Sequence, residues 1–207
     1  QVSIRSSMCS HTSYVGERFK DVTSISWSPD GSLLATGCYD GVIRLWDKQG
    51  VLKCMLHEHT GPIFSLKWSK CGLYLLSGSH DRQTIVWNPL DGTTVKKYIQ
   101  HTGPVFDVDW LNDEIFATGS ADKTIIISTV SSSDNKPLAV FTGHLSEINT
   151  IRWSPDGKFL ASCSDDGTAK VWSIDNGLVY NLQGHTKEIY TLRWSCMKSS
   201  NSMYLCT

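Results

Sequence analysis

Residues Gly143–Ser173 read GHLSEINTIRWSPDGKFLASCSDDGTAKVWS and contain three runs in which apolar and polar residues alternate. Alternation with a period of two, rich in Val, Ile, Leu, Phe and Trp, is typical of half-buried β-strands. The runs are Ile148–Ser154, Lys158–Ser164 and Thr168–Ser173. Pro155-Asp156-Gly157 separates the first two runs and Asp166-Gly167 the last two, and both are turn signals. The stretch therefore predicts an antiparallel meander.

The same pattern recurs along the chain in one register. A Trp ends each predicted first strand, at intervals of 41, 42, 43 and 41 residues: Trp27, Trp68, Trp110, Trp153 and Trp194. A His precedes that Trp by nine residues in four units: His59, His101, His144 and His185. The second turn carries Asp40, Asp81, Asp122 or Asp166. A Ser or Thr precedes this Asp by four residues, and Trp46, Trp87 or Trp172 follows it by six. Self-similarity at a fixed period indicates a repeat architecture.

The dipeptides at fixed places in the repeat point to a known family. They are Gly143-His144, Gly184-His185 and Trp46-Asp47, with the variants Trp87-Asn88 and Trp172-Ser173. These units resemble WD40 repeats, each of which forms one four-stranded blade of a β-propeller. The resemblance implies an all-β fold with about four and a half blades, as a fragment of a seven- or eight-bladed propeller. A small closed propeller is the alternative.

The repeat also sets the expected unit boundaries. Residues 1–20 are interpreted as the outer strand of an incomplete preceding blade, at Val2–Arg5, plus a loop. The following units are residues 21–56, 57–100, 101–142, 143–183 and an incomplete unit 184–207. In the last unit we expect a strand at Ile189–Ser195, an irregular loop at Cys196–Ser202 and half a strand at Met203–Cys206. Arg18 and Ser128 stand where other units have His and Trp, so blades one and three are expected to be less tightly tied.

Composition excludes several classes of function. The chain is 40% apolar and 19% charged, which is ordinary for a soluble protein. Its formal net charge of −1 argues against general binding to nucleic acid or acidic membranes. No apolar run approaches the roughly 20 residues of a membrane span. The seven Cys form no Cys-x-x-Cys motif, and Cys38 and Cys163 fall within predicted strands as buried thiols. This cysteine usage favours a reducing compartment, the cytosol or nucleus.

One set of residues invites a catalytic interpretation. His144, Ser162 and Asp166 have the composition of a hydrolase triad. The same residue types recur at the same offsets in another unit, however, and a catalytic site is needed once whereas a structural brace is needed in every blade. In WD40 families such residues form a buried chain of hydrogen bonds, which the resemblance assigns here to two tetrads: His59, Ser77, Asp81, Trp87 and His144, Ser162, Asp166, Trp172. We therefore predict no catalytic residues, with a hydrolase as the less favoured alternative.

Metal and cofactor sites are also not predicted. His57-Glu58-His59 suggests a metal pair, but His59 is assigned to a brace and no third ligand stands at useful spacing. No glycine-rich phosphate-binding motif is present.

The remaining function is recognition by the outward loops. In WD40 propellers, partners meet the face around the central channel, near the start of each first strand and the second turn. By register this face contains Asp21, Tyr39, Phe64, His80, Phe106, Glu147, Asn149, Asp165, Glu188 and Tyr190. Aromatic side chains with carboxylates suit a peptide that carries Lys or Arg. The alternative for Phe64 and Phe106 is that they pack between blades.

Longer stretches of sequence point to one group among the WD40 proteins. They include KDVTSISW (Lys20–Trp27), GPIFSLKW (Gly61–Trp68), LASCSDDGTAKVWS (Leu160–Ser173) and HTKEIYTLRWS (His185–Ser195). These strings resemble the transducin-β-like group of corepressor subunits. The resemblance implies a nuclear scaffold, also present in the cytoplasm, that binds histone tails and deacetylase-complex subunits without binding nucleic acid or membrane.

In the transducin-β-like group, a LisH oligomerisation motif and an F-box-like segment precede the propeller, and these 207 residues contain neither pattern. Two alternatives to a corepressor scaffold are also considered. One is a substrate adaptor of a ubiquitin ligase, and the other is a truncated product without function.

Overall fold

The computed structural model describes residues 21–195 and 204–207. All regular structure in these residues is β, arranged as four antiparallel four-stranded sheets and one two-stranded sheet. The first sheet contains β1 (Val22–Trp27), β2 (Leu33–Cys38), β3 (Val42–Asp47) and β4 (Leu52–His57). The second contains β5 (Ile63–Trp68), β6 (Leu75–Ser79), β7 (Thr84–Trp87) and β8 (Thr94–Tyr98).

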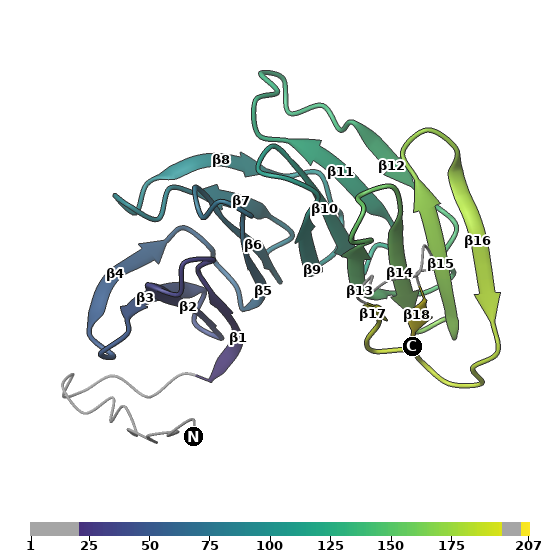
Figure 1. Cartoon of the computed structure of the whole chain (residues 1–207), viewed down its shortest axis with the longest axis horizontal. Coiled ribbons are helices and arrows are strands. Elements are labelled where there is room, and N and C mark those ends of the chain that lie inside the picture. The colour runs from purple at the N-terminus through teal and green to yellow at the C-terminus, as the bar shows by residue number, and fades with distance from the viewer. Residues whose placement is uncertain (1–20, 196–203) are drawn as a thin grey trace.

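The next two sheets follow the same plan. The third contains β9 (Val105–Trp110), β10 (Ile115–Ser120), β11 (Ile125–Thr129) and β12 (Ala139–Phe141). The fourth contains β13 (Ile148–Trp153), β14 (Leu160–Ser164), β15 (Thr168–Ser173) and β16 (Gly177–Gln183). Strands are paired in chain order within each sheet. Figure 1 shows the four sheets succeeding one another along an arc, with each first strand on the inner side and each fourth strand on the outer side. This is the blade arrangement of a WD40 propeller, which confirms the predicted fold class.

Hydrogen bonds within the first turn explain where the first strand of a blade ends and the second begins. In blade four the hydroxyl of Ser154 donates to the Asp156 carboxylate at 2.7 Å and accepts the amide of Phe159 at 3.0 Å. Gly157 completes the turn at φ +73°, a conformation that a residue without Cβ adopts at little cost. Blade one repeats the arrangement, with Ser28 donating to Asp30 at 2.6 Å. The Ser-Pro-Asp-Gly sequence is therefore a self-capped turn.

The apolar core lies between successive blades rather than within one. The inner strand of each later blade presents three buried side chains to the blade before it, and in blade two these are Ile63, Leu66 and Trp68. They form one cluster with residues of blade one such as Ala35, Ile43 and Leu45. The corresponding side chains of β1 have no described blade before them: Val22, Ile25 and Trp27 are 49%, 64% and 52% exposed. Burial therefore depends on stacking, as in other repeat proteins.

A buried carboxylate on the inner strand of blade three joins three blades. Asp107 is 5% exposed. One oxygen accepts the hydroxyl of Ser65 in blade two at 2.8 Å. The other accepts the amide of Ile151 in blade four at 3.0 Å and forms an ion pair with the Arg152 guanidinium. The carboxylate is thus satisfied from both neighbouring blades.

The incomplete fifth unit differs from the sequence prediction. The expected strand Ile189–Ser195 is regular only over β17 (Arg193–Trp194), which pairs with β18 (Leu205–Cys206). A strand is defined by its backbone pairing with a neighbour, and in this unit only Arg193 and Trp194 pair with β18. Ile189 is nevertheless 5% exposed, because it packs against blade four. The predictions for residues 1–20, including Val2–Arg5 and Arg18, and for Cys196–Ser202 lie outside the described residues, as does Met203.

Two further observations concern the described residues. None of them belongs to a helix of the length and apolarity that a membrane crossing requires. Cys38 and Cys163 are buried, as expected from their places in strands, and burial raises the pKa of the Cys163 thiol to about 12.

We predict that Asp107→Ala lowers the free energy of unfolding by about 3 kcal/mol, because it leaves a partly buried guanidinium without its counter-charge. Urea denaturation followed by circular dichroism measures the effect. Asp175→Ala, at an exposed turn of blade four, is the matched control and should change stability by less than about 0.5 kcal/mol. Equal effects of the two substitutions would contradict the linking role of Asp107.

Candidate functional site

The two tetrads have nearly identical geometry. In blade two the His59 ring lies 2.8 Å from the Asp81 carboxylate through Nδ1 and 2.7 Å from the Ser77 hydroxyl through Nε2. The Trp87 indole donates to the same hydroxyl at 2.8 Å. In blade four the corresponding distances for His144, Ser162, Asp166 and Trp172 are 2.8, 2.7 and 2.8 Å.

One assignment of protons satisfies every group in a tetrad. An ionised Asp only accepts hydrogen bonds, so the imidazole donates from Nδ1–H. Its Nε2 then accepts the Ser O–H, and the Ser oxygen accepts the indole N–H. The brace therefore needs a neutral His beside an ionised Asp. It joins the loop before the first strand to the second and third strands and to the second turn.

The local environment favours these protonation states. Burial lowers the pKa of His144 and outweighs the opposite effect of Asp166. Burial by itself would raise the pKa of Asp166, but hydrogen bonds from Thr168, from the amide of Leu145 and from His144 bring it to about 2. The fold thus keeps the imidazole neutral and the carboxylate charged near neutral pH.

The burial of the Ser162 hydroxyl argues against the hydrolase alternative for His144, Ser162 and Asp166. Ser162 has no exposed surface, and its oxygen already contacts the His144 ring and the Trp172 indole. A substrate carbonyl therefore has no path to the hydroxyl. A third blade also repeats the arrangement, with His101 bonded to Asp122 at 2.9 Å and to Thr118 at 2.8 Å.

Blades one and three keep part of the brace and replace the rest. In blade three Ser128 occupies the place of the Trp and donates to the side chain of Gln100 at 2.9 Å. In blade one the Trp46 indole donates to Thr36 at 2.9 Å. There the second-turn Asp40 pairs with Arg44 at 3.0 Å. Weaker tying of these two blades remains a prediction.

A half-brace in the fifth unit was not predicted from the sequence. His185 Nε2 lies 2.7 Å from the hydroxyl of Thr207. Extending the β17–β18 pairing by one residue places Thr207 opposite Leu192, as Ser162 lies opposite Ile151. Thr207 follows Trp194 by 13 residues, whereas Ser162 follows Trp153 by nine. The longer connection hid the correspondence.

The residues predicted for partner binding gather at one end of the blades. In each blade an amide of the second turn donates to the carbonyl that opens the first strand. Tyr39 bonds to Asp21 at 2.9 Å, and the equivalent bonds are His80 to Pro62 at 2.9 Å and Asp165 to Glu147 at 3.1 Å. The start of the first strand and the second turn therefore form one rim, which we call the turn rim.

The aromatic residues of the turn rim fall into two groups. Tyr39 and Tyr190 are 62% and 69% exposed. Phe64 is half-buried and contacts Phe106 at 5.3 Å and His80 at 6.0 Å between ring centroids. Phe64 and Phe106 thus pack between blades two and three while keeping part of their surface accessible. His80 itself is exposed.

The polar residues of the turn rim concentrate on blades four and five. Glu188 is exposed, and Glu147 and Asp165 are half-buried. Asn149 donates to the Asp165 carboxylate at 2.6 Å and to the carbonyl of Ile189 at 3.0 Å. Because these bonds use its amide donors, Asn149 orients Asp165 and holds blade five. Glu147, Asp165 and Glu188 therefore offer negative charge on this part of the turn rim, next to the exposed Lys187.

Three turn-rim residues were not singled out from the sequence. Leu145 is 81% exposed beside its brace histidine. Arg82 and Lys123 have φ of 71° and 72° at the turn position where blades one and four have Gly41 and Gly167. A side chain there strains the backbone by roughly 1 kcal/mol. These cations are visible in the sequence only as departures from Gly.

Metal binding finds no support in the described part of the chain. It contains no group of three or more His, Cys, Asp or Glu side chains placed to hold a metal ion. His57 is exposed, whereas His59 is turned into its brace.

The repeat, the blades and the braces together define a WD40-repeat protein. The family described as "WD domain, G-beta repeat" matches residues 7–47, 50–88, 92–127 and 135–173, and the chain belongs to it. Propellers of this family generally bind proteins.

Comparison with individual proteins shows which WD40 proteins this chain resembles. The chain is 47% identical over 141 residues to the F-box-like/WD repeat-containing protein TBL1X of Mus musculus, covering 68% of this chain and 26% of the relative. It is 48% identical to the WD40 repeat-containing protein HOS15 of Arabidopsis thaliana, covering 76% of this chain and 25% of the relative. The crystal structure of the C-terminal WD40 domain of Sif2 superimposes with a TM-score of 0.78 at 30% identity, covering 89% of this chain and 52% of that domain. The chain thus spans about a quarter of the length of these two sequence relatives.

We predict that Ser162→Ala lowers the free energy of unfolding by about 2 kcal/mol, because it leaves the His144 ring nitrogen and the Trp172 indole without their buried partner. Ser133→Ala, at an exposed loop position, is the control and should be neutral. Thermal and urea denaturation measure both. A neutral Ser162→Ala would contradict the brace.

Stability should also fall on acidification. The folded-state pKa values of His144 and Asp166 are both lowered. Their stabilisation is complete above the unfolded pKa of the imidazole, 6.5, and is lost progressively as the pH falls through the lower folded values. Urea midpoints measured from pH 8 to pH 4 should therefore decrease below about pH 6.5. A midpoint constant down to pH 4 would contradict this assignment of protons.

Proposed function

We propose that this part of the chain is a non-catalytic protein-interaction scaffold that presents the turn rim to a partner. Membership in the WD40 family supports the general role. The braces support the mechanism, because they hold the rim loops in place before binding. A preorganised surface loses little conformational entropy when a partner binds.

The partner is a basic peptide of the histone-tail type. The observation that carries this proposal is the grouping of Glu147, Asp165 and Glu188 with the exposed Tyr190 on adjoining blades. A Lys or Arg side chain of the peptide pairs with the carboxylates and lies against the tyrosine ring. Partial burial of two of these carboxylates reduces their screening by salt relative to fully exposed charges.

The setting is a nuclear corepressor complex with histone-deacetylase subunits. The transducin-β-like strings of the sequence support this setting, as does the similarity to TBL1X. The deacetylase subunits would be partners of the whole protein, of which this chain spans one part.

A ubiquitin-ligase adaptor is the second candidate. The observation that favours it is the term "F-box-like" in the name of the mammalian relative. Affinity purification of the tagged chain from nuclear extract separates the two candidates. Ligase subunits without deacetylase subunits would favour the adaptor, and the reverse result would favour the corepressor setting.

We expect a fluorescein-labelled peptide rich in Lys and Arg to bind the chain, and the double variant Glu147→Lys/Glu188→Lys to bind it at least about tenfold more weakly. The reason is that two attractive charges become repulsive. Fluorescence anisotropy in 50 and 150 mM salt measures the affinity. The matched control is Asp175→Lys, which changes the charge at the turn that joins β15 to β16.

Three results would contradict the basic-peptide proposal. They are equal binding of an acidic peptide of the same length, an unchanged affinity in the double variant, and an equal loss in the Asp175→Lys control.

A further inference from the structure

The connection between β11 and β12 reaches the outer strand of the neighbouring blade. It comprises residues 130–138, whereas the matching connections of the other blades are residues 48–51, 88–93 and 174–176. Figure 1 shows it on the outer side of the arc. Asn135 donates to the Lys97 carbonyl of β8 at 3.3 Å and accepts the side-chain amide of Gln100 at 2.5 Å. The Lys96 ammonium donates to the Ser132 carbonyl. We call residues 130–138 the strap, because they join blade three to blade two.

The strap begins at a carboxylate of its own blade. The backbone carbonyl of Glu114, in the first turn of blade three, accepts the amide of Val130 at 2.9 Å. The Glu114 carboxylate accepts the amide of Ser131 at 2.8 Å. Further along, the Ser132 hydroxyl donates to the Asp134 carboxylate at 2.8 Å. The start of the strap is therefore held by hydrogen bonds to negatively charged groups.

One serine of the strap stands in a charge pattern that a class of enzymes recognises. Ser131 is exposed, and its hydroxyl has no hydrogen-bond partner among the described residues. Asp134 follows it by three positions, and an acidic residue at that distance is the pattern by which acidophilic serine kinases select their substrates. In the whole sequence only Ser131 and Ser162 have an Asp or Glu three positions after a Ser or Thr. Ser162 has no exposed surface, so Ser131 is the accessible hydroxyl with this pattern.

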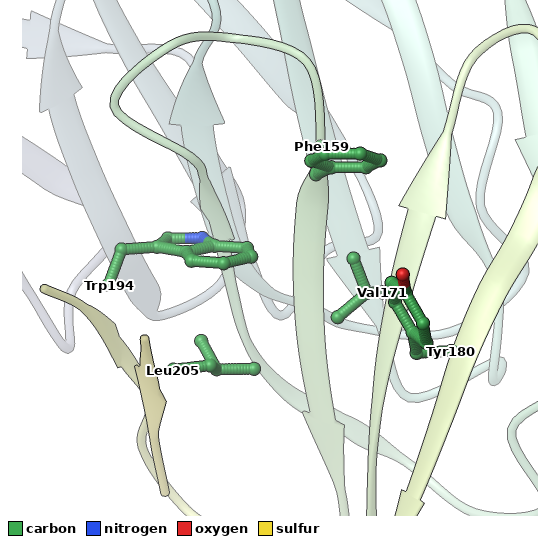
Figure 2. Close-up of a pocket in the computed structure, with 5 residues that line it drawn as sticks. All are labelled: Phe159, Val171, Tyr180, Trp194 and Leu205. Carbon is green, nitrogen blue, oxygen red and sulfur yellow. The ribbon is translucent and has the colours of Figure 1, made fainter. Parts of the chain in front are cut away.

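An exposed hydroxyl without charged neighbours offers a phosphate no ion pair to make or break. Tyr180 is 58% exposed, and Figure 2 shows it at a pocket of about 240 Å³ between blade four and β17–β18. The other side chains that line this pocket carry no charge: Phe159, Val171, Trp194 and Leu205. The surroundings of Ser131 differ, because carboxylates and an ammonium group contact its own residue or the next.

We propose that Ser131 is a phosphorylation site of an acidophilic serine/threonine kinase, and that the phosphate detaches the start of the strap. The Ser131 oxygen attacks the γ-phosphorus of a nucleoside triphosphate, and a new O–P bond forms. The bond from that phosphorus to the bridging oxygen breaks, so that the nucleoside diphosphate leaves and the hydroxyl proton passes to the kinase's catalytic base. This site is distinct from the turn rim and does not depend on the proposed function.

Repulsion between like charges explains the detachment. A phosphoserine carries a charge of about −1.5 to −2 at neutral pH, and next to Asp or Glu it disrupts the local structure. The amide of Ser131 is bonded to the Glu114 carboxylate, so a phosphate on the same residue is repelled by that group. Asp134 adds a second carboxylate within the strap. Lys96 attracts the phosphate, but its ammonium already donates to the Ser132 carbonyl that anchors the strap to blade two.

The strap is connected to the part of blade three where the brace is incomplete. Gln100, which donates to Asn135 of the strap, accepts the hydroxyl of Ser128 at 2.9 Å. Ser128 stands where the complete tetrads have Trp. Detachment of the strap therefore loosens the contact between blades two and three at the position that lacks an indole.

The modification is tested on the full 207-residue chain with an acidophilic serine/threonine kinase and ATP, followed by peptide mapping with tandem mass spectrometry. We expect phosphate on Ser131. Asp134→Asn keeps the side-chain oxygen that accepts the Ser132 hydroxyl but removes the charge, and it should slow the modification at least about tenfold. Ser133→Ala, at the other exposed serine of the strap, is the matched control and should leave the rate unchanged.

Hydrogen exchange measures the effect on the strap. The amides of Val130 and Ser131 should exchange at least about tenfold faster in the phosphorylated chain, because their bonds to Glu114 are lost. The control is the amide of Asn88, which is bonded to the Thr93 carbonyl at 2.9 Å in the matching connection of blade two and should be unaffected.

Three outcomes would overturn the proposal. Modification of a free peptide of residues 128–138 but not of the folded chain would show that Ser131 is inaccessible to the kinase. An equal rate for Asp134→Asn would remove the role of the acidic residue. Unchanged or slower exchange of the Val130 and Ser131 amides would show that attraction by Lys96 outweighs repulsion by Glu114, so that the phosphate does not detach the strap.

Discussion

A buried imidazole, hydrogen-bonded through both ring nitrogens, is the interaction on which blades two, three and four depend. His59, His101 and His144 each lie between a carboxylate and a hydroxyl at 2.9 Å or less. A buried polar network of this kind stabilises only when every member has a partner. It also fixes the loop that precedes each first strand. The rigidity of the turn rim is therefore a result of chemistry inside the blade.

Much of the fold could be predicted from the sequence because its information is local and repeated. Period-two alternation and turn residues located the meanders, and the shared register of His, Ser or Thr, Asp and Trp located the braces. Each of these features lies within one unit of about 41 residues. The grouping of the turn-rim residues also followed from the register of the repeat, because it depends only on where each first strand starts and where each second turn lies.

The missed features depend on contacts between units or on irregular spacing. Asp107 reads as an ordinary residue of an alternating strand, and only the neighbouring blades reveal that its carboxylate is satisfied by Ser65 and Ile151. The half-brace of His185 and Thr207 was hidden by a longer connection. The division of the rim was hidden as well: blades two and three carry Arg82 and Lys123, and blades four and five carry the carboxylates. The turn rim therefore presents cations on blades two and three and carboxylates on blades four and five.

The carboxylate of Asp107 has a consequence for how the repeat array comes apart. Where each unit of such an array contacts only the next, units can detach singly from an end, and the whole behaves as a nearest-neighbour chain. Asp107 lies in blade three, and its one carboxylate takes part in the interfaces with both blade two and blade four, so that loss of either interface removes a partner from the group that the other needs. These three blades should consequently lose structure as one cooperative block, whereas blade one, held to blade two by contacts such as the Trp68 indole on the Ser26 carbonyl at 2.9 Å, can open separately.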